Sequence, residues 1–220
     1  NRAQKLWFSL LFGMTYNSSL AWVYYNHYPD PTNIDWDDLD KWNRATLDRQ
    51  PFQTDTRYNK GRIVAIWQSI AHWIHTEGGG DIERAFDKQI TSDATASYHN
   101  VHRQLLRLRK YGRMTAWLAA QCLYETAGLP IAPDTMFTDD PGNQSVWNGT
   151  CYYWSLENMT VGSQPKYAGY KPTPKDRAKF RGLEQQLMEE CRARVDHPDL
   201  SYFTLETHLC QFKKLLTGGD

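Results

Sequence analysis

The stretch Ile63-Val64-Ala65-Ile66-Trp67-Gln68-Ser69-Ile70-Ala71-His72-Trp73-Ile74-His75-Thr76, followed by Gly78-Gly79-Gly80, decides the fold class. Its apolar side chains recur at the three- and four-residue spacing of one helix face: Ile63, Ile66, Trp67, Ile70 and Ile74. The three glycines end the helix, because glycine readily takes the left-handed conformation that closes one. The sequence therefore predicts a core helix that opens at Arg57 or Tyr58 and runs to about Thr76.

The same period recurs on both sides of this helix. Asp35 and Asp81 stand where N-caps are expected, and Thr173-Pro174 is a typical opening for a long helix. Strand-like alternation is nearly absent. Further helices are predicted at 2–28 (with a break at Gly13 or at 17–19), 36–49, 81–90, 95–110, 113–127, 173–195 and 204–216. The predicted fold is all-α, with a long irregular loop region at about 129–172.

Length and composition are those of a globular chain. The 220 residues are 40% apolar, 23% charged and 14% aromatic, with a formal net charge of zero. We expect a single compact helical domain over 1–220, with two helical lobes, about 1–110 and 111–220, as the alternative. Zero net charge does not suggest non-specific nucleic-acid binding, although a local basic face stays open. No apolar run is long enough to cross a bilayer, so no membrane partner is expected.

Cysteine usage favours a reducing compartment. The four cysteines, at 122, 151, 191 and 210, include no CxxC pair, so zinc or thioredoxin-like spacing is absent. Four Asn-x-Ser/Thr acceptor patterns are a counter-signal, but they mean little without a signal peptide. His208 and Cys210 lie near Glu206 without further spaced ligands, so no metal site is predicted. The expected location is the cytoplasm.

The residues just before the core helix are unusually charged. Asp55-Thr56-Arg57-Tyr58-Asn59-Lys60-Gly61-Arg62 holds three cations and a carboxylate within eight residues. Cations in a first helical turn oppose the helix dipole, whereas an anion bound there would be stabilised. The stretch therefore predicts a phosphate or pyrophosphate site. The alternative is that Asp55 caps the helix and the cations are solvated.

A second polar cluster occupies 138–149, where two adjacent carboxylates precede a Pro-Gly turn. Asp139 or Asp140 is a candidate general base or metal ligand. Asn143, Gln144 and Asn148 could then read the edge of a base or another substrate. The alternative is an ordinary turn, because Asp-Pro-Gly-Asn is a common turn sequence.

A third cluster lies in the helix predicted at 95–110. At helical spacing Arg103, Arg107 and Lys110 share one face, which is typical of a contact with a nucleic-acid backbone. The alternative is a solvated face, which is what charge runs usually are. Because the whole chain is neutral, the remainder must be net acidic, and that segregation slightly favours the functional interpretation.

Five blocks spread over the chain resemble the phage amino acid:DNA transferases. They are Leu11-Phe12-Gly13-Met14-Thr15-Tyr16 with Ala21-Trp22, then 55–62, Gly112-Arg113-Met114-Thr115-Ala116-Trp117, Asp139-Asp140-Pro141-Gly142-Asn143, and 204–214. The family is associated with thymine hypermodification in bacteriophage DNA. It is thought to be related to thymine pyrophosphorylase-like proteins and, more distantly, to helical DNA glycosylases. The resemblance therefore implies a DNA glycosylase-like helical fold.

The reaction that the resemblance implies has two partners, double-stranded DNA and a free amino acid, in the host cell cytoplasm. The DNA carries 5-pyrophosphoryloxymethyluracil, a pyrophosphorylated 5-hydroxymethyluracil, and the amine of the amino acid displaces pyrophosphate from it. Either the amine attacks directly or pyrophosphate leaves first through an exocyclic methylene. No cofactor is implied, and assistance by Mg²⁺ stays open.

Residue roles follow from this reaction. Arg57, Lys60 and Arg62 would stabilise the leaving pyrophosphate, and Asp139 or Asp140 would take the amine proton. Flipping the base from the stack requires an aromatic pocket, and the wall candidates are Tyr16, Trp22, Tyr58 and Trp147. Arg113 or Lys213 would bind the carboxylate of the amino acid. The remaining expected substrate contacts are Asn17, Asp55, Asn59, Asn143, Gln144 and Asn148.

Two other functions stay open on the sequence. A DNA glycosylase-like hydrolase would need a catalytic Asp near a Gly-x-Gly hairpin, and no such hairpin is evident. A non-catalytic helical module that binds DNA would retain its function after substitution of Asp139 and Asp140.

Overall fold

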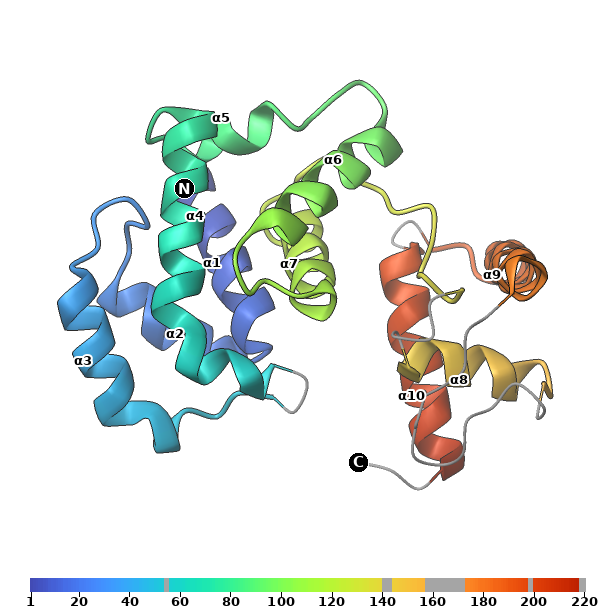
Figure 1. Cartoon of the computed structure of the whole chain (residues 1–220). Helices are drawn as coiled ribbons and strands as arrows, with labels where there is room; N and C mark the ends of the chain where they lie inside the picture. The colour runs from blue at the N-terminus through green and yellow to red at the C-terminus, as the bar shows by residue number, and fades with distance from the viewer. Residues whose placement is uncertain (54–55, 140–143, 157–172, 198–199, 218–220) are drawn as a thin grey trace. The chain divides into compact units, whose positions relative to one another are not determined.

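The computed structural model confirms the all-α prediction (Figure 1). It describes residues 1–53, 56–139, 144–156, 173–197 and 200–217. Ten α-helices and two short 3₁₀ helices lie in these ranges, and none of the residues in them forms a strand. The chain separates into two compact units, Asn1–Ala132 and Pro133–Asp220, and each is described by itself.

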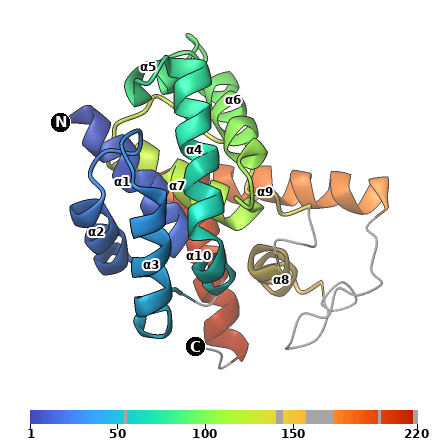
Figure 2. The ribbon, with the colours of Figure 1, turned by 60° about the vertical axis from the view of Figure 1, so that its left-hand side comes forward.

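The first unit holds the helices from α1 to α7 (Figure 2). Helix α1 packs mainly against α7, while α3 and α5 both contact α4. In chain order the elements are α1 (Arg2–Thr15), α2 (Ser18–His27), α3 (Trp36–Thr46), η1 (Leu47–Arg49), η2 (Arg57–Arg62), α4 (Ile63–Gly78), α5 (Ile82–Asp87), α6 (Ala94–Arg107) and α7 (Arg113–Glu125).

Close packing of α1 on α7 depends on small residues. A Cβ added at Gly13 would lie 2.6 Å from the Cβ of Ala119 and 2.7 Å from the carbonyl oxygen of Thr115. The Ala119-Ala120 pair on the most apolar predicted helix therefore does admit a close neighbour. Beside this contact the rings of Trp7 and Trp67 pack edge to face, with centroids 5.0 Å apart.

Local capping chemistry sets most of the helix boundaries. The side chains of Asp35, Asp81 and Thr173 cap α3, α5 and α9 (Pro174–Arg194) as predicted, and Gly79 closes α4 with a φ of 66°. The core helix begins later than predicted, because α4 starts at Ile63 and residues 57–62 form the 3₁₀ helix η2 instead.

The second unit contains α8 (Gln144–Tyr153), α9 (Pro174–Arg194) and α10 (Tyr202–Thr217). Helices α8 and α10 pack closely, since a Cβ at Gly149 would overlap the backbone of Leu209. One cluster of its buried core consists of Met136, Val146, Leu187, Met188, Leu205 and Leu209. Helix α8 lies within the predicted loop region 129–172, and its residues 146–151 are all buried.

No helix among the described residues is both long enough and apolar enough to span a membrane. All four cysteines are described, and none forms a disulfide.

Candidate functional site

Helix η2, the most charged segment of the sequence, is anchored to its surroundings by hydrogen bonds. The hydroxyl of Thr56, just before η2, donates to the carbonyl of Thr15 at 2.8 Å. The amide of Asn43 on α3 donates to the carbonyl of Lys60 at 3.0 Å. Both ends of the segment are therefore fixed to other helices of the first unit.

Asn59 makes the most informative of these contacts. Its side-chain amide is buried and donates to the carbonyl of Met14 at 2.8 Å and to the hydroxyl of Thr115 at 3.3 Å. Asn59 thus joins η2 to the last turn of α1 and the first turn of α7. We call this the Asn59 junction. Three of the five sequence blocks, those holding Met14, Asn59 and Thr115, meet here.

The charged side chains of η2 lie on its outer side. Arg57 and Arg62 are exposed and Lys60 is half-buried. The Arg57 guanidinium lies 5.0 Å from the ring centroid of Tyr58 and also donates to its hydroxyl. Tyr58 itself is 62% exposed. An anchored backbone that presents cations outward is suited to binding an anion. The residue before Thr56, Asp55, lies outside the described residues.

Arg113 extends the positive charge of this region. It is the exposed first residue of α7, two positions before Thr115 of the Asn59 junction. The N-cap of α7 is Gly112, which offers no side chain to cap the helix. The start of α7 therefore adds a guanidinium and the positive end of a helix dipole to the junction.

Two of the expected aromatic wall residues, Tyr16 and Trp22, lie at the end of α1 and on α2. Tyr16 has a left-handed backbone, with a φ of 48°, and its ring contacts that of Phe12. A non-glycine residue in this region is strained, which is uncommon outside functional sites and turns. Its neighbour Asn17 caps α2, where its side chain accepts from the backbone of Leu20. Trp22 on α2 is 56% exposed and stacks on Tyr25.

The expected DNA-backbone residues do not share one helical face. Helix α6 ends at Arg107, because the following residue, Leu108, takes an extended backbone. Lys110 lies beyond this end with a φ of 64°. Only Arg103 and Arg107 therefore keep the one-turn spacing, and both are exposed.

In the second unit Asp139 is paired with two arginines that sequence reasoning missed. Its side chain is 7% exposed and accepts a hydrogen bond from Nε of Arg181 at 3.0 Å. Nη1 of Arg177 donates to the Asp139 carbonyl at 3.1 Å and lies 3.9 Å from the carboxylate. The Asp139 carboxylate is therefore oriented by Arg181, with Arg177 close by.

Sequence reasoning also missed a buried carboxylate, that of Glu184 on α9. It is buried and accepts from the backbone N–H of Met136 at 2.6 Å and from the hydroxyl of Thr138 at 2.5 Å. Burial raises the pKa of Glu184, and these hydrogen bonds partly oppose that rise. The signal in the sequence is its position between Phe180 and Leu187 on the apolar face of the helix. Glu184 fixes the turn that leads to Asp139.

The other site residues predicted in this unit have different surroundings. Trp147 is fully buried and stacks on Phe180 at 3.8 Å, so its ring belongs to the core. Asn148 is also fully buried, and Lys213 is half-buried on α10. Asp140 and Asn143 lie outside the described residues, as does the side chain of Gln144.

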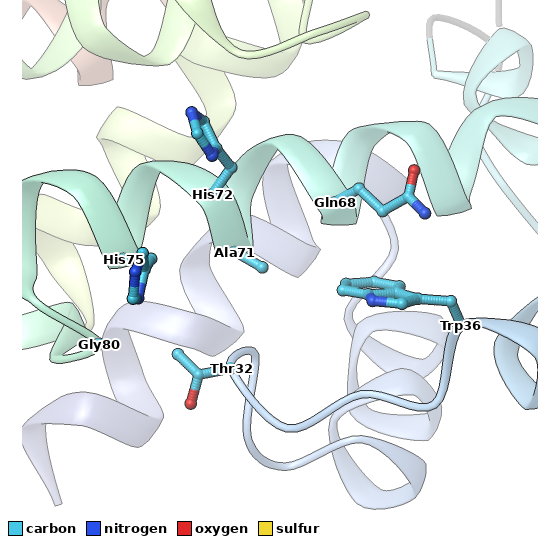
Figure 3. Close-up of a pocket in the computed structure, with 7 residues that line it drawn as sticks. All are labelled: Thr32, Trp36, Gln68, Ala71, His72, His75 and Gly80. Atoms are coloured by element: carbon cyan, nitrogen blue, oxygen red, sulfur yellow. The ribbon is translucent and has the colours of Figure 1, made fainter.

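The first unit also contains a pocket that no predicted site residue lines (Figure 3). Its volume is about 400 Å³. The indole of Trp36 lies beside Gln68, and His75 extends from α4 toward the loop that holds Thr32. Ala71, His72 and Gly80 complete the lining. Among the described side chains, no three of His, Cys, Asp or Glu are grouped so that they could hold a metal ion.

Comparison with known proteins identifies the family of the chain. The profile of a family described as amino acid:DNA transferase matches residues 1–219. A protein of Salmonella phage ViI named "Serinyltransferase" is 23% identical over 201 residues, which are 88% of this chain and 48% of that protein. The chain thus spans about half the length of this curated relative. No solved structure matches, so the predicted likeness to DNA glycosylases stays a prediction. The chain belongs to the amino acid:DNA transferase family.

Proposed function

We propose that the protein transfers an amino acid to 5-pyrophosphoryloxymethyluracil in phage DNA, in the host cell cytoplasm, with release of pyrophosphate. The observation that carries the proposal is the Asn59 junction, where three separated sequence blocks meet in a segment that also holds exposed Arg57 and Arg62 and half-buried Lys60. Family membership supports the amino acid and the DNA as substrates. The assignment of pyrophosphate as the leaving group rests on the charge of η2 and on the resemblance of the sequence blocks to the family.

The chemical step forms one bond and breaks another. The amine nitrogen bonds to the exocyclic methylene carbon of the base while the bond from that carbon to the pyrophosphate oxygen breaks. Both electrons of the broken bond leave with pyrophosphate, so cations at the leaving oxygens lower the barrier. Arg57, Lys60 and Arg62 are proposed to serve this purpose, and Arg113 to bind the carboxylate of the amino acid.

Tyr16 and Tyr58 are proposed to enclose the flipped base, with Trp22 as a further stacking surface. The left-handed backbone of Tyr16 supports its role, because Gly or Asn would close α1 with less strain. A contact between its ring and the substrate would explain why a tyrosine occupies a position whose backbone disfavours it. Trp147 is left out, since its ring is buried in the core of the second unit.

The amine proton must pass to an acceptor, either a carboxylate or water. Asp139 and Asp140 are both proposed as the carboxylate candidate, and Arg181 orients the first of them. If pyrophosphate leaves before the amine attacks, the acceptor can be a weaker base. The proposal assigns no cofactor, and the assay is run with and without Mg²⁺.

The test uses the full chain, duplex DNA containing the pyrophosphorylated base, and a mixture of amino acids that includes serine. Digested nucleosides are analysed by mass spectrometry, and released pyrophosphate is measured in parallel. We expect an amine adduct with one pyrophosphate per adduct. Free base or an abasic site would instead indicate a glycosylase, and unchanged DNA that is nonetheless bound would indicate a binding module.

Substitutions assign the result to the site. Replacing Arg57 and Lys60 with Gln should lower turnover more than DNA binding. The matched control is Arg103 and Arg107 replaced with Gln, which also removes two exposed charges from the first unit. That pair should lower DNA binding instead. Equal losses of turnover and binding in the Arg57 and Lys60 variant would count against the pyrophosphate role.

A further inference from the structure

The first half of α9, drawn in orange in Figures 1 and 2, concentrates positive charge that the sequence analysis did not single out. Four exposed cations lie within seven residues: Lys175, Arg177, Lys179 and Arg181. Neither lysine forms an ion pair with a described residue, while both arginines contact Asp139. In a chain of zero net charge, this is a local excess of one sign.

Two described carboxylates near these cations are engaged in hydrogen bonds. Asp176 closes the capping box of α9, where it accepts from the backbone N–H and the hydroxyl of Thr173 at 2.8 and 2.7 Å. Asp139 is buried and holds Arg177 and Arg181 from beneath. The side chain of Arg181 nevertheless stays 66% exposed. The two guanidinium groups are therefore oriented in advance and still accessible.

Helix stability does not explain this arrangement. Lys175 and Lys179 are one turn apart, as are Arg177 and Arg181, and like charges at this spacing repel each other. Lys175 and Arg177, in the first turn, also oppose the helix dipole. The last turn of the same helix shows the favourable pattern, with Arg192 and Arg194 at its negative end.

Two small exposed residues separate the two pairs of cations. At 3.6 residues per turn, Ala178 and Gly182 lie between the lysines and the arginines on the exposed side of α9. Glycine weakens a helix interior, and a Cβ at Gly182 would meet nothing within 4 Å. Packing therefore does not require this glycine. Close approach of a large, flat or rod-like partner does explain it.

We propose that this surface, formed by Lys175, Arg177, Ala178, Lys179, Arg181 and Gly182 and here called the α9 cationic surface, binds the phosphate backbone of DNA. Two flanks of cations on either side of a small-residue strip suit a charged backbone that approaches the helix closely. Because DNA is the substrate in the proposed function, the identity of the partner rests on that proposal. In this inference Asp139 is a positioning residue, which acts through the two arginines.

The test measures binding of the full chain to unmodified duplex DNA by fluorescence anisotropy at several salt concentrations. In Lys175→Gln/Lys179→Gln the slope of log affinity against log salt should become shallower by roughly 1 to 2, since each lost phosphate contact contributes about 0.9. The matched control, Arg192→Gln/Arg194→Gln, removes two charges from the same helix and should keep the slope.

A second variant keeps every cation. Gly182→Glu places a carboxylate in the middle of the surface and also removes a helix-weakening glycine, so it should fold normally while binding DNA at least several-fold more weakly. Equal slope changes in the two double variants, no change in either, or unchanged affinity in Gly182→Glu would each overturn the proposal. If the α9 variants do not show the expected changes in DNA binding but the chain transfers amino acids, the proposed function still stands. Transfer is measured separately by mass spectrometry.

Discussion

Asn59 should stabilise the first unit and also support turnover, because it joins three helical segments from inside. Asn59→Ala removes hydrogen bonds of 2.8 Å to the Met14 carbonyl and 3.3 Å to the Thr115 hydroxyl. Each bond contributes about 1 kcal/mol net, and a buried acceptor left without its donor costs about 1–3 kcal/mol more. Two bonds at about 1 kcal/mol each and this penalty together give an expected loss in the free energy of unfolding of about 3–5 kcal/mol.

The assay is urea unfolding followed by tryptophan fluorescence, since Trp7 and Trp67 lie in the core of this unit. The adjacent exposed residue supplies the control, and Tyr58→Ala should change stability by less than about 0.5 kcal/mol while lowering turnover. A double-mutant cycle of Asn59→Ala with Thr115→Val should give a coupling energy of about 0.5–1 kcal/mol. A loss under about 0.5 kcal/mol for Asn59→Ala, or an equal loss for Tyr58→Ala, would refute the anchoring role.

Three further predictions concern packing, pH and strain. Gly13→Ala should destabilise the chain by about 1–3 kcal/mol because of the clash with Ala119. In thermal unfolding the control Gly182→Ala should be neutral or gain up to about 1 kcal/mol. Equal changes in stability for the two variants would contradict the close packing of α1 on α7. Burial lowers the pKa of His102 to about 4. As the pH falls below about 6.5, His102 is therefore protonated in the unfolded chain before it is protonated in the folded chain. The free energy of unfolding should fall by up to about 3 kcal/mol as the pH drops from about 6.5 toward 4. His102→Gln should remove that part of the pH dependence from urea midpoints, and an unchanged dependence would disprove it. Tyr16→Asn should keep or raise the melting temperature, because Asn tolerates the left-handed backbone, yet it should lower amino acid transfer; full transfer would rule out a role for the ring.

Local chemistry made much of the fold predictable. Asp35, Asp81 and Thr173 cap helices as expected because an N-cap depends on only a few neighbouring residues. The late start of α4 was not predictable in this way. Residues 57–62 form a 3₁₀ helix whose Asn59 bonds to partners 45 and 56 positions away, and no local pattern shows such contacts. The end of α6 at Arg107 likewise broke a spacing argument that assumed a continuous helix.

The candidate site was likewise predictable only in part. The sequence indicated the cations of η2 by composition alone. The contact of η2 with the ends of α1 and α7 depends on tertiary packing, which the sequence pattern does not show. For Asp139 the residue type suggested a base, whereas its environment is decided by Arg177 and Arg181, which lie 38 and 42 residues later. Trp147 looked like a stacking surface in a polar loop, and helix formation buried it against Phe180.

The central claim is that the cations of η2 bind the leaving pyrophosphate. The most direct test is calorimetric titration of the full chain with pyrophosphate, which requires neither turnover nor DNA. We expect binding by the wild-type chain, a loss of at least about tenfold, or 1.4 kcal/mol, in Arg57→Gln/Lys60→Gln, and unchanged affinity in Arg103→Gln/Arg107→Gln. Equal affinity for pyrophosphate in all three proteins would contradict the claim.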